Sequence, residues 1–217
     1  FAQNSGISGD NVVKLNKTLM DLSGMTFDTA TNVSKMAAGM AKAANVSTKK
    51  VLEDMQSNAE AFAKYSMAGA DGMARAAVEA AKIGSSLSVV LGTADKLLQF
   101  ETSISDQFKA QVLTGRQLNL ERARQLALEG DFAGLTAEIQ SIVGGVGDLQ
   151  AMNVIERQSI ASALGMTVSD LQKIAAGEAP EERAEIKLAK EANNYLREIA
   201  GHTEDSAKNN KTQTAIF

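Results

Sequence analysis

Residues 71–84 read DGMARAAVEAAKIG. On a helix, the small and apolar residues of this stretch share one side, at Met73, Ala76, Ala77, Ala80 and Ile83. Because alanine side chains are short, a helix with such a face can approach its neighbours closely. Asp71 suits the start of this helix and Gly84 suits its end. The stretch therefore predicts a closely packed helix within a helical protein.

The preceding residues repeat the helical pattern. A first apolar stripe steps by 3, 4 and 3 residues, at Val12, Leu15, Leu19 and Leu22. A second helix is predicted over residues 27–44, with Thr26 as its N-cap and Asn45 in the left-handed conformation that ends it. Ser47 or Thr48 caps a third helix, whose stripe takes the same steps at Leu52, Met55, Ala59 and Phe62.

The following residues continue this pattern. It stays helical from residue 86 to about residue 113, with Gly92 as a weak point and a break expected near residues 101–103. Later helices are predicted to end at the glycines that follow their apolar runs, at Gly115, Gly130, Gly144–Gly147 and Gly165. The glycines of 144–147 also predict a hinge.

Two further start signals lie in this half of the chain. Asp131 is predicted to cap the helix that begins at Phe132. Thr167 and Asp170 resemble a capping box, with Asp in the place of Glu or Gln, and open a short helix that reaches Ala176. Each predicted helix is thus short and has its own cap.

The composition changes after Gly177. Pro180 and the acidic pair Glu181–Glu182 suit the first turn of a helix, predicted within residues 178–200. This helix is highly charged, and its narrow apolar seam steps by 4, 3 and 4 residues, at Leu188, Ala192, Tyr195 and Ile199. Such a seam is typical of a coiled-coil or docking helix, so we predict self-association through these four residues. Residues 201–217 are polar and predict a loosely structured tail.

The predicted fold class is therefore all-α. Residues 1–177 form a multi-helix array of short capped helices, and a longer charged coiled-coil-like helix follows it. One proline among 217 residues and 44% apolar residues agree with helices around a real core. The start, FAQNSGISGD, lacks the pattern of a signal peptide and an initiator Met. We read the chain as a piece of a longer protein.

Composition also excludes several kinds of site. The chain has no cysteine, which rules out disulfides, thiolate metal ligands and cysteine nucleophiles. Its one histidine, His202, lies in the polar tail, where a solvated side chain explains it. The net charge of −4 argues against binding of specific nucleic acid. No apolar run reaches the roughly 18 residues of a membrane span. We predict no metal site and no cofactor.

The acidic residues offer no convincing catalytic pair. Glu53 and Asp54 lie beside Lys49 and Lys50, where salt bridges one helical turn apart explain them. The pair Glu181–Glu182 complements a helix dipole. Glu101, followed by Thr102 and Ser103, faintly resembles the catalytic Glu of lysozyme-like transglycosylases. We predict no catalytic residue and no enzyme activity.

The remaining candidate sites also have simpler structural explanations. The glycines of 144–147 lack the Lys-Ser/Thr that a phosphate-binding loop requires. The aspartates do not have the spacing of a calcium-binding loop, at Asp71, Asp95 and Asp131. Several methionines have helical spacing and favour core filling over an adaptable binding surface, at Met36, Met40, Met55, Met67 and Met73.

One local basic cluster consists of Arg116, Arg122 and Arg124. Glu121 and Glu129 lie close enough in sequence to offset its charge. Structural salt bridges are the favoured explanation for the cluster, and a docking role is the alternative.

Three stretches carry a resemblance to a known family. Residues 51–84 read VLEDMQSNAEAFAKYSMAGADGMARAAVEAAKIG, residues 86–131 read SLSVVLGTADKLLQFETSISDQFKAQVLTGRQLNLERARQLALEGD, and residues 156–177 read ERQSIASALGMTVSDLQKIAAG. They resemble the helical domain of bacteriophage tail tape measure proteins, especially those of tailed phages of cyanobacteria and marine bacteria. The resemblance spans roughly residues 10–176, and residues 113–119 are its most distinctive part.

This resemblance implies a structural role in the virion. Tape measure proteins extend inside the tail tube, set its length during assembly and leave ahead of the DNA during infection. It implies a homo-oligomer, a trimer, whose partners are the tail tube protein and the baseplate hub or tail tip proteins. It also implies contact with the host envelope after ejection. The caps and glycines favour a compact helical domain of such a protein.

Two other functions are alternatives. A cell-wall hydrolase domain of a tail protein would use Glu101, and loss of wall-clearing activity in Glu101→Gln would favour it. An amphipathic, membrane-active helical protein would bind liposomes and gain helicity. The balanced charge and the lack of a basic polar face argue against the second alternative.

Overall fold

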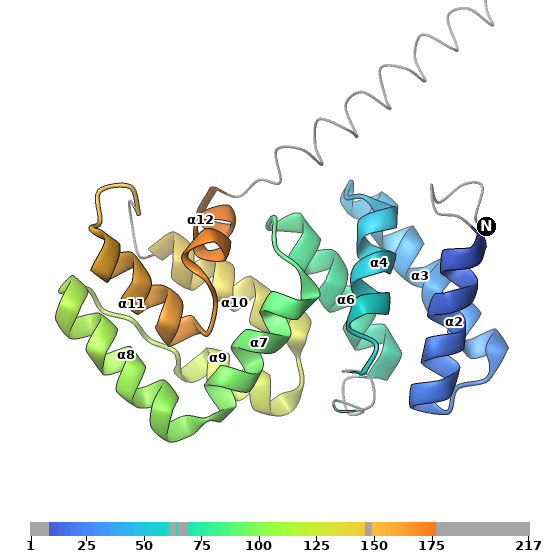
Figure 1. Cartoon of the computed structure of the whole chain (residues 1–217), viewed down its shortest axis with the longest axis horizontal. Coiled ribbons are helices and arrows are strands. Elements are labelled where there is room, and N and C mark those ends of the chain that lie inside the picture. Colours follow the sequence, from blue (N-terminus) through green and yellow to red (C-terminus); the bar gives the residue numbers. More distant parts are fainter. Residues whose placement is uncertain (1–8, 61–63, 65–68, 146–148, 177–217) are drawn as a thin grey trace, which may run out of the picture. The chain divides into compact units, whose positions relative to one another are not determined.

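The computed structural model of the chain describes residues 9–60, 64, 69–145 and 149–176. Within these residues the protein consists of ten helices and no strand, which confirms the all-α class (Figure 1). The helices are α2 (Gly9–Ser23), α3 (Phe27–Ala44), α4 (Thr48–Ser57), α6 (Gly69–Lys82), α7 (Leu87–Leu98), α8 (Phe100–Thr114), α9 (Glu121–Glu129), α10 (Phe132–Gly145), α11 (Val154–Leu164) and α12 (Val168–Ala176).

The first helix boundaries follow from local capping. Thr26 accepts a hydrogen bond from the Thr29 backbone N–H at 3.2 Å, as an N-cap does. Asn45 ends α3 with φ 61° and ψ 37°, the predicted left-handed conformation. At the start of α4, Ser47 rather than Thr48 is the N-cap, and its hydroxyl accepts from the Lys50 N–H. Thr48 is the first helical residue and is buried.

The predicted caps of two later helices are confirmed as well. Asp131 accepts a hydrogen bond from the Gly134 N–H at 2.9 Å, at the start of α10. Asp170 N–H donates to Thr167 Oγ1 at 3.1 Å, and Thr167 N–H donates back to the Asp170 carboxylate at 3.4 Å. A second capping box, between Asn153 and Glu156, opens α11 and was not predicted.

The break predicted between residues 86 and 113 is wrong in position. The break falls at Gln99, not near residues 101–103, and separates α7 from α8. Leu97 on α7 and Ser103 on α8 are both fully buried. The turn at Gln99 between them lets each helix bury its own face. Gly92 lies inside α7, where the helix is continuous. A Cβ built on Gly92 would lie 3.9 Å from the Gly165 carbonyl oxygen, so this glycine marks the close approach of α7 to the end of α11.

Helix α6 is the central element of the core. It packs against α3, α4, α7 and α10, which Figure 1 shows around it. Its buried face is broader than the predicted one, because Ala74, Val78 and Ala81 extend it, and its buried residues are Met73, Ala74, Ala76, Ala77, Val78, Ala80 and Ala81. Asp71, Arg75 and Lys82 remain exposed on the opposite side. The small side chains of this broad face allow four helices to approach one axis.

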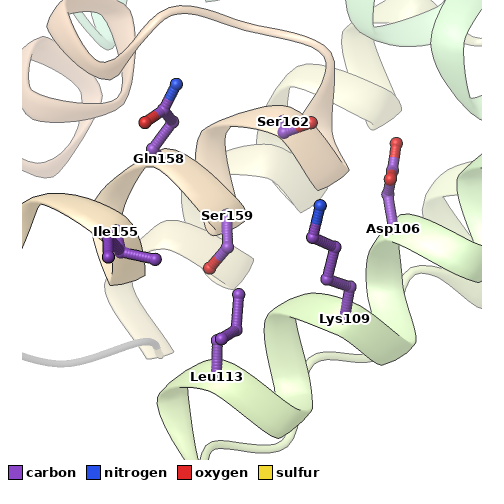
Figure 2. Close-up of a pocket in the computed structure, with 7 residues that line it drawn as sticks. All are labelled: Asp106, Lys109, Leu113, Ile155, Gln158, Ser159 and Ser162. Atoms are coloured by element: carbon purple, nitrogen blue, oxygen red, sulfur yellow. The ribbon is translucent and has the colours of Figure 1, made fainter.

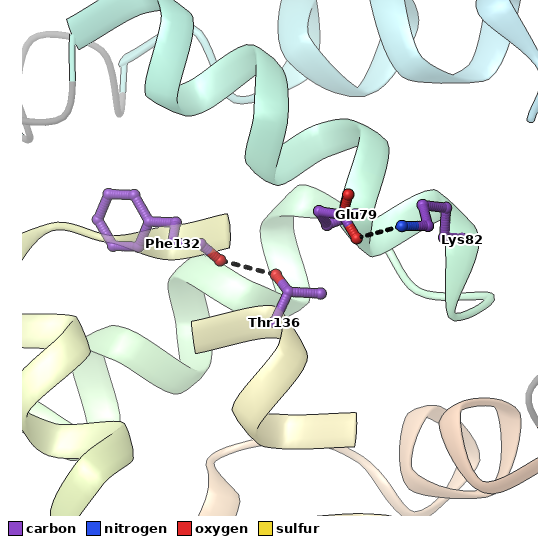
Figure 3. A network of polar contacts seen from close by, with 4 residues as sticks. All are labelled: Glu79, Lys82, Phe132 and Thr136. Carbon is purple, nitrogen blue, oxygen red and sulfur yellow. Dashed lines mark hydrogen bonds and ion pairs between the residues drawn. The ribbon is translucent and has the colours of Figure 1, made fainter. Parts of the chain in front are cut away.

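Polar groups at the contact of α6 with α10 have their hydrogen bonds satisfied locally (Figure 3). The hydroxyl of buried Thr136 donates to the Phe132 carbonyl oxygen at 2.8 Å, one turn earlier on α10. On α6, Lys82 Nζ lies 2.7 Å from a carboxylate oxygen of Glu79, and both side chains are partly exposed. The contact itself can therefore be apolar and close.

A buried polar link fixes α2 on α3. The side-chain amide of Asn16, only 3% exposed, donates to Thr31 Oγ1 at 3.0 Å. Its carbonyl oxygen accepts from the fully buried Ser34 hydroxyl at 2.7 Å. Because a buried amide without partners is costly, this pair of bonds favours one register of the two helices.

The methionines fill the core where the structure describes them. Met55 and Met73 are fully buried, and Met36 and Met40 pack partly buried against the same cluster. Several predictions concern residues outside the described ranges, namely those for Met67, Phe62, the latter part of the hinge at 144–147, the charged helix at 178–200 and the tail at 201–217.

Overpacking α6 tests its central role. Ala77→Leu adds three carbons at a fully buried position, and we expect it to lower the free energy of unfolding by about 1–3 kcal/mol. The matched control is Ala137→Leu on the exposed side of α10, which should change it by less than about 0.5 kcal/mol. Urea unfolding followed by far-UV circular dichroism measures both. Equal effects of the two substitutions would contradict the central placement of α6.

Two glycines separate backbone strain from steric contact. Gly115 and Gly165 have similar φ angles of 64° and 68°. A Cβ on Gly115 meets nothing within 4 Å, whereas one on Gly165 would lie 2.5 Å from Lys96 Cβ. Gly115→Ala should cost about 1–2 kcal/mol from the left-handed conformation alone. Gly165→Ala should cost about 1–3 kcal/mol more, from the clash with α7. Denaturant unfolding of both variants measures the difference in unfolding free energy. Equal losses would show that α7 can move away from the new methyl group at no cost.

Candidate functional site

Several predicted sites fall outside the residues that the structure describes. These are the self-association seam, the pair Glu181–Glu182 and His202. Of the predicted hinge, Gly144 and Gly145 are described and belong to the last turn of α10.

Glu101, the one weak catalytic candidate, lies in the first turn of α8 with an exposed side chain. The described residues contain no group of three or more His, Cys, Asp or Glu side chains that could hold a metal ion. None of the described helices is both long and apolar enough to cross a membrane.

Asp54 makes a long-range contact that its sequence neighbours do not predict. One carboxylate oxygen accepts a hydrogen bond from the backbone N–H of Leu87, the first residue of α7. The other accepts from the Asn58 side-chain amide at 3.0 Å. Asp54 thus joins α4 to the positive end of the α7 dipole, and the charge of Lys50, the predicted neighbour, also acts on it.

Burial sets the protonation behaviour of Asp54. Removal from water raises the pKa of its carboxyl group above the ordinary value. The hydrogen bond from Leu87, the charge of Lys50 and the hydrogen bond from Asn58 oppose this change. The effect of desolvation is the largest, so the folded protein holds a proton on Asp54 more tightly than the unfolded chain does.

A polar groove of about 300 Å³ lies between α8 and α11 (Figure 2). Its lining consists of Asp106, Lys109, Leu113, Ile155, Gln158, Ser159 and Ser162. The Asp106 carboxylate already pairs with Lys96 Nζ at 2.6 Å. The Ser159 hydroxyl donates to the Glu156 carbonyl oxygen at 2.8 Å. The Asp106 carboxylate thus joins two helices, and the Ser159 hydroxyl bonds within its own helix.

A larger groove of about 470 Å³ lies between α8 and α9. Its apolar lining comes from Phe100, Ile104 and Phe108 on α8 and from Leu128 on α9. Between 44% and 64% of each of these residues is exposed. These four side chains form an exposed apolar surface beside α9.

Arg124 is the one cation among the residues that line this groove. Its Nε donates to Ser103 Oγ at 3.0 Å, and its Nη2 donates to Gln107 Oε1 at 2.6 Å. Partial burial lowers the pKa of the Arg124 guanidinium, and the charge of Glu121 opposes that effect. An arginine stays protonated in proteins. The groove therefore combines an apolar lining with one positive and one negative side chain, those of Arg124 and Glu121.

The basic cluster predicted from sequence is divided in space. Arg122 Nε lies 3.3 Å from a carboxylate oxygen of Glu138 on α10, so its salt bridge is confirmed with a partner other than Glu121 or Glu129. Glu129 instead accepts a hydrogen bond from Gln125. Arg124 is held by neutral groups. The structural explanation is thus confirmed for Arg122, and the docking alternative stays a prediction.

Comparison with protein-family models, with curated proteins and with solved structures finds no match to this chain. Function must therefore be argued from the residues, the fold and the groove between α8 and α9.

The sequence analysis did not identify this groove. A signal was present, because Phe100, Ile104 and Phe108 step by 4 residues and form a stripe separate from the buried residues Ser103 and Ala110 of the same helix. The expected break near 101–103 divided that stripe. The contact between Asp54 and Leu87 had no local signal, because 33 positions separate the two residues.

The raised pKa of Asp54 predicts a pH dependence of stability. Between the ordinary value of 3.8 and the folded value, the native state binds more protons than the unfolded state. The contribution of Asp54 to the free energy of unfolding therefore falls as the pH rises through this window, and is constant above it. Asp54→Asn removes the titrating group and should remove that fall. Urea unfolding of both proteins from pH 3 to pH 7 measures the difference, and a ¹³C NMR titration of the Asp54 carboxyl group gives its pKa directly. A pKa below 3.8 would contradict the argument.

Proposed function

We propose that this protein is a structural component of a bacteriophage tail, of the tape measure class. It would reside in the tail tube lumen and at the baseplate hub, help to set tail length during assembly and leave during DNA ejection. The observation that carries the proposal is that the stretches resembling tape measure proteins fall on short, separate helices. Residues 51–84 include α6, residues 86–131 include α7 to α9, and residues 156–177 include α12.

The way the helices are held together supports this role. The chain has no cysteine, so no disulfide crosslinks them. Caps at residues such as Thr26, Ser47 and Asn153 satisfy the helix ends from within a few residues. A helix capped in this way keeps its end bonds when a neighbouring helix moves away. That property suits a protein that packs during assembly and leaves through a tube.

The proposed role requires surfaces rather than catalysis. The apolar groove between α8 and α9 provides one surface on the described domain. The seam predicted at Leu188, Ala192, Tyr195 and Ile199 would join copies of the chain, as a trimer. In this proposal the other partners are the tail tube protein and the hub or tail tip proteins.

A single introduced cysteine tests the proposed location. Ser57→Cys at the exposed end of α4 gives a unique thiol in a chain that has none. In purified virions of the phage that encodes the chain, we expect a bulky maleimide reagent to leave this thiol unlabelled, because the tail tube would shield it. After ejection is triggered, the thiol should react completely. Mass spectrometry of the protein quantifies the labelled fraction.

The free Ser57→Cys chain is the control, because its exposed thiol should react completely in solution. Labelling in intact virions would place the chain on the tail exterior and contradict the proposal. Absence of the chain from purified virions would contradict it as well.

A further inference from the structure

The large apolar side chains of α8 face away from the domain. The buried residues of this helix are the small Ser103 and Ala110. Four of its exposed apolar residues follow one another at steps of four and form a single row, at Phe100, Ile104, Phe108 and Val112. A helix that covers only its own core buries its apolar row. This row is therefore the face of α8 that remains for another helix to cover.

The row lies beside a hollow on the same surface. The groove of about 470 Å³ between α8 and α9 is lined by three residues of the row, from Phe100 to Phe108. Side chains spaced by four residues form the ridges that pack into the grooves of a facing helix. When two identical surfaces meet across a two-fold axis, every contact occurs twice, so each surface must carry both parts. This surface carries the ridge and the groove side by side.

Charges beside the row match an antiparallel second copy. Glu101, Ser105 and Lys109 each follow the row by one position and form a second row parallel to it. Glu101 and Lys109 are exposed, and neither has an ion pair within the part of the chain that the structure describes. A two-fold axis near Ser105 brings Glu101 of each copy beside Lys109 of the other. A parallel arrangement would bring like charges together instead.

Two other features agree with this arrangement. The axis near Ser105 lies within one residue of the middle of the apolar row, so both rows match their copies in one register. The groove itself adds no net charge, because its lining includes one arginine and one glutamate, Arg124 and Glu121. Two copies of the groove therefore meet without an excess of like charge.

The exposed apolar area is sufficient for a stable dimer. The exposed fractions of the four row residues and of Leu128 on α9 range from 44% to 82%. At about 200 Å² for each fully exposed side chain, these five residues present roughly 600 Å². A standard interface buries about 800 Å² on each partner, of which about 60% is apolar. The five residues thus supply the apolar part, and the polar residues at the edges supply the remainder.

We propose that two copies of this chain pair through α8, antiparallel about a two-fold axis near Ser105. The apolar row of each copy lies against the row and groove of the other, and two contacts between Glu101 and Lys109 flank them. This contact is separate from the seam predicted at residues 188–199. It does not rest on the proposed tail function, because its residues lie on α8 and α9 and any assembly would leave their chemistry unchanged.

Charge reversal tests the pairing with the full chain. Glu101→Lys and Lys109→Glu each turn two symmetric contacts from attraction to repulsion, so we expect each to weaken self-association about tenfold in sedimentation velocity. The double variant Glu101→Lys/Lys109→Glu has opposite charges again and should associate like the wild type. An equal mixture of the two single variants should also associate, because each copy then carries the charges that the other lacks.

Two substitutions on α3 and one on α8 complete the experiment. Lys35→Glu, at an exposed lysine of α3, is the control for a change of charge and should leave association unchanged. Phe108→Gln should weaken association strongly, whereas Phe27→Gln, at an exposed phenylalanine of α3, should not. All the substituted side chains are exposed, so the fold should be retained, which far-UV circular dichroism checks.

Three results would overturn the proposal. A wild-type chain that stays monomeric would leave the row for a different protein. Self-association that Phe108→Gln does not weaken would place the contact elsewhere, such as at the seam of residues 188–199. Association that depends on Phe108, but is the same in the single charge variants and in their mixture, would exclude the antiparallel arrangement.

Discussion

The fold depends on the close packing of α6. Its buried alanines let α3, α4, α7 and α10 approach a single helix, and Met73 and Val78 fill the larger spaces. At the contact of α6 with α10, Thr136 donates its hydroxyl to the Phe132 carbonyl oxygen of its own helix, and Glu79 pairs with Lys82 at the edge. The small side chains of α6 thus allow four helices to pack against it. The hydrogen bond within α10 allows polar Thr136 to be buried at this contact.

Outside that core, a few polar side chains decide how neighbouring helices are joined. Asn16 links α2 to α3 through two hydrogen bonds, and Asp54 links α4 to the start of α7. Arg124 links α9 to α8 through Ser103 and Gln107. The Asn16 link is buried, whereas Arg124 lines an open groove. A contact that orients two helices therefore also places a positive charge on an apolar surface.

The groove between α8 and α9 and the proposed tail function rest on different observations. The proposed tape measure role rests on the resemblance of three stretches and on a helical array that has no covalent crosslinks. The proposed pairing of two copies over this groove rests on the exposed row from Phe100 to Val112 and on the opposite charges of Glu101 and Lys109. A tail protein that assembles with several partners needs such surfaces, but the chemistry of the groove would be the same in any assembly. The two proposals can therefore be tested independently.

The sequence by itself determined the all-helical class and most helix ends, because a cap joins a side chain to a backbone N–H about three residues away. Thr26, Asn45, Asp131 and the pair Thr167–Asp170 were all predictable for this reason. Tertiary structure decided the break at Gln99, the breadth of the buried face of α6, the contact between Asp54 and Leu87, and the exposure of Phe100, Ile104 and Phe108 on α8. These features depend on which helix faces meet, and residues far apart in the chain supply the opposing surfaces.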